Sequence, residues 1–453
     1  MQVGTVQKLI NIFNQSFNEL GVPISLEKLE ALAVTIHRAM TVQARQFHTL
    51  EHVFTFVDLN DPIRTLAALY HDIVYYGVDM GFLPQIWELI APYVRQEGGD
   101  FFVSETIPAD DRLVALILDV FDLAPGQKLS SVAALNEFLS ALVMVRQLGG
   151  LVAERDLLRM ILCIEATIPF RSFTADGKSH FHVLENRLTE ISRRFGLQLS
   201  AREVVETIKT AVVFANKDIE NFAESDPARF LSNTWKLLPE TNVGLRLPEV
   251  YSIQTYRQAL MRMETFFSNL NPDTVFNQYE GLPPDEVFQQ MVRYARANIK
   301  IAHEYLQIKM LGTTIIEALA LATGGDAPLS LFLGDLPREG ASIKRLEYFL
   351  PELEPAAWVD QHSVIYTLLE TGRYGDVGFD MKNSPLSLFV YRSVHPDRIA
   401  EYFRHAREFY AGTLSPHDFL MKLDPHVLQP IARASSVMVF TRRQALLRYA
   451  GEN

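Results

Sequence analysis

Hydrophobic residues recur at the spacing of an α-helix along almost the whole chain, and no other feature constrains the fold as strongly. Over residues 5–20 they form one broad apolar face, which is typical of an amphipathic helix: Val6, Leu9, Ile10, Ile12, Phe13, Phe17 and Leu20. The same period predicts helices over 25–40, 64–76, 82–95, 110–121, 131–147, 154–167, 182–195, 200–224, 252–268, 285–322, 343–349, 363–370, 397–410 and 415–422. Alternating strand patterns are scarce, and no Asn-Gly or Asp-Gly turn joins two β-rich segments. The sequence therefore predicts an all-α protein.

The length of the chain, 453 residues, predicts more than one domain at about 150 residues per domain. Proline, glycine and asparagine cluster in the segment SNLNPDTVFNQYEGLPPDE, so we expect a domain boundary near residues 270–284. The predicted organisation is a first helical domain over 1–270 and a second helical domain, of unknown role, over 285–453.

Charge and composition exclude several classes of protein. The net charge of −12 disfavours a nucleic-acid binder. The longest apolar stretches, such as Leu113–Ile117 and Ala318–Ala322, are far shorter than the roughly 18 residues of a membrane helix. The N-terminus shows no signal-peptide pattern, and the single cysteine, Cys163, cannot form an internal disulfide, so we expect a cytoplasmic protein without a membrane partner. A small anionic substrate would then need a local positive centre, for which a metal ion is the obvious candidate.

Three places put metal-ligating groups where the helical period expects core. In RQFHTLEHVFTF, His48 and His52 stand four residues apart, so a helix would place both on one face. In LAALYHDIVYY, His71 and Asp72 interrupt an apolar helix, and Asp218 lies on the inward stripe of AVVFANKDIENF. Burying an unpaired carboxylate is expensive, so such groups are paired or coordinate a metal. Inward histidines and aspartates could satisfy one another around one divalent cation.

The order His…His-Asp…Asp on helices resembles the HD-domain superfamily of metal-dependent phosphohydrolases. FHTLEHV is similar to the Y-H-N-x-x-H motif of its cyclic nucleotide phosphodiesterase branch and to the Y-H-N-L-x-H-V motif of bacterial HD hydrolases; ALYHDIVY is similar to their A-x-x-H-D-x-x-Y motif. The resemblance covers about residues 35–270 and implies an HD-type helical domain followed by the second helical domain. It implies that His52, His71, Asp72 and Asp218 are the metal ligands and that His48 is the general acid.

The resemblance also implies a divalent cofactor, Mn, Mg, Zn or Fe, with Asp72 both ligating and catalytic through a bridge to a second ion. Glu165 and Thr167, in CIEAT, fall where the bacterial hydrolases carry an Ala-Thr pair near the substrate. The histidine that usually follows that pair is replaced here by the Pro169 region, which leaves the substrate open.

Cations near the predicted ligands are candidates for binding phosphate. Arg45 precedes His48 by three residues, and Lys217 precedes Asp218 directly. Each could orient a phosphate, although a solvated lysine or arginine is the commoner role for such a residue. His180 and His182, in SHFH, have the spacing of a metal pair in a strand or loop and lie between the His-Asp pair and Asp218, as additional ligands do in HD proteins with two metals.

These features together predict a metal-dependent phosphohydrolase, similar to phosphodiesterases, that acts on a nucleotide phosphodiester or phosphomonoester. Two alternatives stay open. One is an HD-fold di-iron oxygenase, which would need further histidine ligands such as His180 or His182. The other is a non-catalytic protein that binds a nucleotide or serves interactions. The oligomeric state is not predicted.

Overall fold

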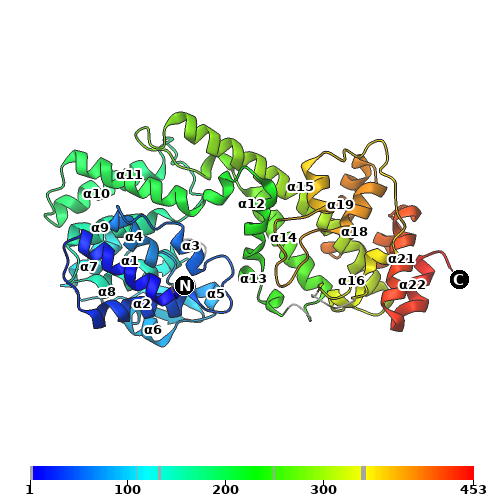
Figure 1. Ribbon diagram of the computed structural model, residues 1–453, viewed down its shortest axis with the longest axis horizontal. Coiled ribbons are helices and arrows are strands. Elements are labelled where there is room, and N and C mark those ends of the chain that lie inside the picture. Colours follow the sequence, from blue (N-terminus) through cyan, green and yellow to red (C-terminus); the bar gives the residue numbers. More distant parts are fainter. Residues whose placement is uncertain (1–3, 109, 131–133, 248–249, 338–342, 453) are drawn as a thin grey trace. The chain divides into compact units, whose positions relative to one another are not determined.

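The computed structural model describes residues 4–108, 110–130, 134–247, 250–337 and 343–452. Helices make up most of this part of the chain (Figure 1), which confirms the predicted all-α class. Contacts divide the chain into two compact units. Unit 1 contains Met1–Ala223 and Asn271–Ala295, and unit 2 contains Glu224–Leu270 and Arg296–Asn453.

Unit 1 is built from helices and one small three-stranded sheet. Its elements are α1 (Thr5–Glu19), α2 (Leu26–Met40), α3 (Leu50–Phe54), α4 (Pro62–Tyr70), α5 (Tyr76–Asp79), α6 (Pro84–Ile90), β1 (Val94–Glu97), β2 (Asp100–Val103), α7 (Arg112–Phe121), β3 (Lys128–Leu129), α8 (Leu135–Leu148), α9 (Glu154–Ala166), α10 (His180–Arg194) and α11 (Ala201–Asp218).

Helix α9 is the central helix of unit 1. It packs against α4, α7, α8 and α11, so it has neighbours on most of its surface. Its residues from Met160 to Ala166 are all buried. A helix that is buried all round carries apolar side chains on every face, and Glu165 is the charged exception in this stretch.

The small sheet is an element that the sequence analysis missed. Strands β1 and β2 pair antiparallel with Glu97 opposite Asp100, and β3 adds to β2. Gly98 and Gly99 between them both have positive φ, at 57° and 92°, which the two-residue turn of a hairpin requires. The predicted helix over 82–95 ends at Ile90 because a strand begins at Val94.

Unit 2 is helical in its described residues. Its elements are α12 (Pro227–Trp235), α13 (Leu237–Thr241), α14 (Ile253–Asn269), most of α15 (Asp285–Thr323), α16 (Leu329–Leu333), α17 (Val364–Glu370), α18 (Pro385–Ser393), α19 (Pro396–Tyr410), α20 (Pro416–Leu420), α21 (Pro425–Met438) and α22 (Arg443–Tyr449).

The division between the units differs from the predicted boundary near 270–284. Helices α12 and α14 lie in unit 2, because their buried polar groups find partners far along the chain. The Arg257 guanidinium pairs with the Glu317 carboxylate at 2.8 Å, and Trp235 Nε1 donates to Asp380 at 2.8 Å.

The Pro- and Gly-rich segment after α14 returns to unit 1 instead of linking two domains. The Asn216 side chain donates to the carbonyl of Asn277 and accepts from its backbone N–H, both at 2.8 Å. Tyr279, in the same segment, is buried within the unit 1 core. The Pro and Gly residues interrupt the helical pattern in this segment. The hydrogen bonds between Asn216 and Asn277 connect the segment to unit 1.

Helix α15 is long and apolar enough to cross a membrane by length and composition, although no membrane span was expected. However, 78% of its most apolar window is buried inside the protein. This is also the pattern of a core helix in a soluble protein.

The unit division predicts how a chain ending at Leu270 behaves. Such a chain keeps α12 and α14 but loses Glu317 and Asp380, the buried partners of Arg257 and Trp235. We expect aggregation or dye binding to exposed apolar surface, measured by light scattering and dye fluorescence against the full chain. A monodisperse product with protected amides in residues 253–269 would contradict this division.

Candidate metal centre

Helix α4 presents His71 and Asp72 at its C-terminal end. The Asp61 side chain caps its first turn by accepting from the Arg64 backbone N–H at 3.0 Å, and Pro62 occupies the first helical position. The helix ends at Tyr70, earlier than the predicted 76, and His71 is its C-cap. The last carbonyls of a helix carry partial negative charge, which favours a cation at this position.

His71 is buried, with a side chain only 1% exposed. Its Nδ1 lies 2.8 Å from the carbonyl oxygen of Ala68, one turn back, and donates to it. This hydrogen bond orients the ring and leaves Nε2 as the atom that faces the other candidate ligands. A ligating histidine is commonly held in this way through its second ring nitrogen.

His52 lies in the short helix α3, whereas His48 lies in the bend before it. The expectation that a single helix carries both residues was therefore wrong, because α3 begins only at Leu50. The two rings are still close, with centroids 6.1 Å apart. The His48 ring also contacts Tyr75, at 4.4 Å between centroids.

Asp218 is the last residue of helix α11. This helix begins with a capping box between Ser200 and Glu203. Phe214 and Phe56, each one turn from a candidate ligand, pack against the His71 ring, with centroids 5.8 and 4.9 Å away. The apolar stripe that predicts an inward Asp218 is therefore present, and its Phe214 ring packs against the His71 imidazole.

The four predicted metal ligands converge: one ligand atom from each of His52, His71, Asp72 and Asp218 lies within 4.8 Å of the other three. His52 Nε2 lies 3.2 Å from Asp218 Oδ1 and 3.9 Å from Asp72 Oδ2, and His71 Nε2 lies 3.0 Å from Asp72 Oδ2 and 3.6 Å from Asp218 Oδ1. Two atoms bonded at about 2.1 Å to one ion are about 3.0 Å apart at right angles and about 4.2 Å apart when opposite. These distances fit a ligand set around one cation.

Two buried atoms in this group have no hydrogen-bond partner, namely His71 Nε2 and Asp72 Oδ2. A buried polar atom without a partner costs free energy, and these two face each other at 3.0 Å. Burial lowers the pKa of His71, but the charges of Asp72 and Asp218 outweigh burial and raise that pKa well above its ordinary value. The carboxylates of Asp72 and Asp218 therefore favour a positive charge between them. Two imidazole nitrogens and two carboxylate oxygens are suitable ligands for a divalent ion.

Arg45 supports the centre from behind. Its buried guanidinium donates to both oxygens of Asp79, at 2.8 and 2.6 Å, and to the backbone carbonyl of Asp72 at 2.7 Å. The Nε, Nη1 and Nη2 donors of Arg45 all have partners within the protein, so Arg45 stabilises the His-Asp turn. The predicted role in binding phosphate finds no support in these contacts.

Lys217 and Thr167 also have partners within the protein. The Lys217 ammonium forms an ion pair with Glu220 at 2.6 Å, and its side chain is 37% exposed. The Thr167 hydroxyl donates to the carbonyl of Ile164 at 2.7 Å, at the end of α9. Neither contact supports the predicted role in substrate binding.

Glu165 belongs to a second, buried polar cluster with Arg171 and His180. Its carboxylate lies 2.7 Å from Arg171 Nη1 and 3.0 Å from His180 Nε2. His182 instead pairs with the Ser179 hydroxyl at 2.8 Å. Among the described residues, neither histidine joins the four-ligand group, so the additional ligands that a di-iron site would need do not come from this pair.

Glu137, in the first turn of α8, is a residue that the sequence analysis missed. Burial raises its pKa to about 7, and the charges of Asp72 and Asp218 add to this effect. Its neighbours connect α8 to the turn after Asp72: Asn136 accepts from Tyr76 N at 3.1 Å and Ser140 from Val74 N at 3.1 Å. No motif marks Glu137 in the sequence, because only the fold brings α8 to the His-Asp turn.

No family model, curated protein or solved structure significantly matches this chain. The relationship to HD domains therefore stays a prediction, carried by the motifs and by the ligand group.

Metal binding to the four-ligand group predicts a shift in stability. Divalent cation should raise the melting temperature of the wild-type protein, since a ligand of the folded state adds about 2.7 kcal/mol at 100 times its Kd. Asp72→Ala and His71→Ala should lose the shift and the bound metal, measured by mass spectrometry of the purified proteins. His182→Ala is the matched control and should keep both. Full metal occupancy in Asp72→Ala would overturn the assignment.

The Glu165 cluster predicts a change of stability with pH. Burial raises the pKa of Glu165, but Arg171 and His180 outweigh it and lower the pKa to about 2, from 4.5. Between these values the unfolded chain binds more protons, so this contribution is present above pH 4.5 and lost as the pH falls towards 2. At about 1.4 kcal/mol per unit it is on the order of 3 kcal/mol.

The test measures the free energy of unfolding in urea at pH 6 and pH 3. Glu165→Gln should be less stable than the wild type at pH 6, and this difference should shrink at pH 3. Glu190→Gln, at an exposed position on α10, serves as the control and should track the wild type. An equal loss in Glu165→Gln at both pH values would show that the charge is not the cause.

Proposed function

We propose that this protein is a metal-dependent phosphohydrolase that acts on a nucleotide phosphodiester or phosphomonoester. The observation that carries the proposal is the convergence of two imidazoles and two carboxylates, in which the buried atoms His71 Nε2 and Asp72 Oδ2 lack hydrogen-bond partners. Mn, Mg, Zn or Fe would be held by His52, His71, Asp72 and Asp218. When bound, a divalent cation polarises phosphoryl oxygens and acidifies water.

The chain's own residues supply orientation and proton transfer. The Ala68 carbonyl fixes the His71 ring, and Arg45 fixes the Asp72 backbone, so the ligands keep their geometry without a substrate. His48 lies next to the ligands but outside the four-ligand group. Histidine is the side chain that most often acts as a general acid, so His48 suits the transfer of a proton to the leaving oxygen.

The surroundings of the site support a nucleotide as the substrate class. Phe47 lies beside His52, at 5.1 Å between ring centroids, and Tyr75 lies beside His48. Neither ring is fully buried. Aromatic faces at this position suit the stacking of a base, and the cation would neutralise phosphate in a protein of net charge −12.

Separate roles for His48 and His52 predict different losses. His48→Ala should keep its metal and lose roughly 10²–10⁴-fold in turnover on substrates with poor leaving groups. With p-nitrophenyl esters, whose leaving oxygen needs no proton, the loss should be much smaller. His52→Ala should lose metal and activity on every substrate.

The measurement pairs metal content with hydrolysis of cyclic and linear nucleotides and p-nitrophenyl esters. His37→Ala, on helix α2, controls for the loss of an imidazole elsewhere in unit 1. A His48→Ala protein that loses its metal while His52→Ala keeps it would reverse the two roles. Fully metallated wild type without turnover on the panel would refute the proposed activity.

A further inference from the structure

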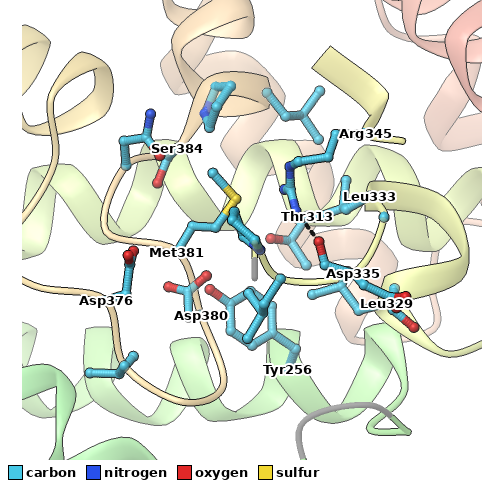
Figure 2. Close-up of a pocket in the computed structure, with 18 of the residues that line it drawn as sticks. Tyr256, Thr313, Leu329, Leu333, Asp335, Arg345, Asp376, Asp380, Met381 and Ser384 are labelled. Atoms are coloured by element: carbon cyan, nitrogen blue, oxygen red, sulfur yellow. Dashed lines mark hydrogen bonds between the residues drawn. The ribbon is translucent and has the colours of Figure 1, made fainter. Parts of the chain in front are cut away.

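Unit 2 contains a cavity of about 670 Å³ that the proposed hydrolase site does not use. Figure 2 shows side chains from separate elements converging on it, including Tyr256 of α14, Thr313 of α15 and the loop residues Asp380 and Met381. Much of the lining is apolar, with Leu329 and Leu333 of α16 among the contributors. A concave apolar site with a few polar groups is the usual form of a small-molecule site.

One part of the cavity is formed by a buried charged cluster. Lys309 and Asp380 both line the cavity, and Arg373, which is not one of the lining residues, pairs with Asp380. The Asp380 carboxylate is 3.1 Å from Lys309 Nζ and 3.2 Å from Arg373 Nη2, and it accepts a hydrogen bond from Trp235 Nε1. The side chains of Lys309 and Arg373 are only 7% and 0% exposed.

This cluster has two cations for one carboxylate. Burial raises the pKa of Asp380, but Lys309 and Arg373 outweigh it and lower that pKa, so the carboxylate carries its charge. The buried cluster therefore has a net charge of one positive unit, and Arg373 Nε lies buried without a hydrogen-bond partner. Buried charge is costly unless it is paired, so an anion in the cavity would stabilise the cluster.

The remaining charges around the cavity define how much negative charge an occupant can carry. Arg345 is already paired with Glu347 at 2.6 Å and donates to the Asp335 carbonyl. Asp335 and Asp376 are exposed acids in the lining, and they disfavour a ligand with several negative charges. A carboxylate carries one unit, whereas a phosphate monoester carries about 1.5 to 2 at neutral pH.

Lys309 has a donor to offer to such an anion. An ammonium group has three N–H donors, and within the described residues the Lys309 ammonium donates to Ser384 at 2.9 Å and to Asp380. This leaves one N–H in a residue that lines the cavity.

We propose that the cavity binds a small apolar molecule that carries one carboxylate. The carboxylate accepts a hydrogen bond from Lys309 Nζ and balances the charge that Asp380 leaves unpaired. The apolar body of the ligand lies against the walls that contain Leu329, Leu333 and Met381. This site is independent of the metal centre, since all of its lining residues belong to unit 2.

The test uses the full chain and three probes of equal length: octanoate, octanol and octylammonium. In calorimetric titration we expect octanoate to bind most tightly, with a Kd roughly tenfold lower than that of octanol. A factor of this size corresponds to the free energy of one hydrogen bond to a charged group. Lys309→Met should abolish the difference in Kd between octanoate and octanol. The Kd for octanol should stay within about twofold of the wild-type value, because the apolar walls are unchanged. Lys300→Met, at an exposed position on the same helix, is the matched control and should behave as wild type.

A second variant keeps the test decisive if Lys309→Met does not fold. Leu333→Trp fills the cavity without changing its charge and should abolish binding of octanoate and octanol together. The proposal is overturned if octylammonium binds as tightly as octanoate, if octanoate shows no lead over octanol, or if Leu333→Trp binds octanoate normally. Asp72→Ala should bind octanoate as wild type does, so failure of the hydrolase proposal would leave this result unchanged.

Discussion

Two carboxylates and two imidazoles meet at one point in unit 1, and this meeting is the constraint on which the rest of the unit depends. Asp72 and Asp218 repel each other unless positive charge lies between them. The surrounding helices nevertheless hold their oxygens and the ring nitrogens of His52 and His71 within 4.8 Å. A fold that keeps such a group together without a cation loses stability, and binding of a cation returns that free energy.

Several features of unit 1 are explained by the need to hold this group still. The Arg45 guanidinium is removed from solvent and holds the Asp72 carbonyl together with the Asp79 carboxylate. Phe56 and Phe214 hold the His71 ring by packing, while the Ala68 carbonyl holds it by a hydrogen bond. Rigid ligands lose little conformational entropy when an ion binds, so the support from these residues would favour binding of a cation by the candidate centre.

Unit 2 handles buried charge differently. Its Lys309, Arg373 and Asp380 side chains form a cluster with two positive charges and one negative charge. In unit 1 the excess charge is negative and calls for a cation, whereas here it is positive and borders a cavity that can admit an anion. Both sites follow from the same rule, that a charge taken out of water needs a partner.

The sequence by itself determined the helical class and the four residues of the candidate metal centre. Helical periodicity is a local property, and an aspartate or histidine on an apolar stripe is visible without knowing which helices pack together. Tertiary structure decided the rest. Arg45 could be taken for a phosphate ligand, but in the structure its guanidinium is paired with Asp79. The charges of Asp72 and Asp218 act on Glu137 only because α8 packs beside the His-Asp turn. The unit boundary and the charged cavity depend on pairs such as Trp235 with Asp380, which are 145 residues apart. Contacts over such separations depend on how the whole chain packs, and no local pattern of residues encodes them.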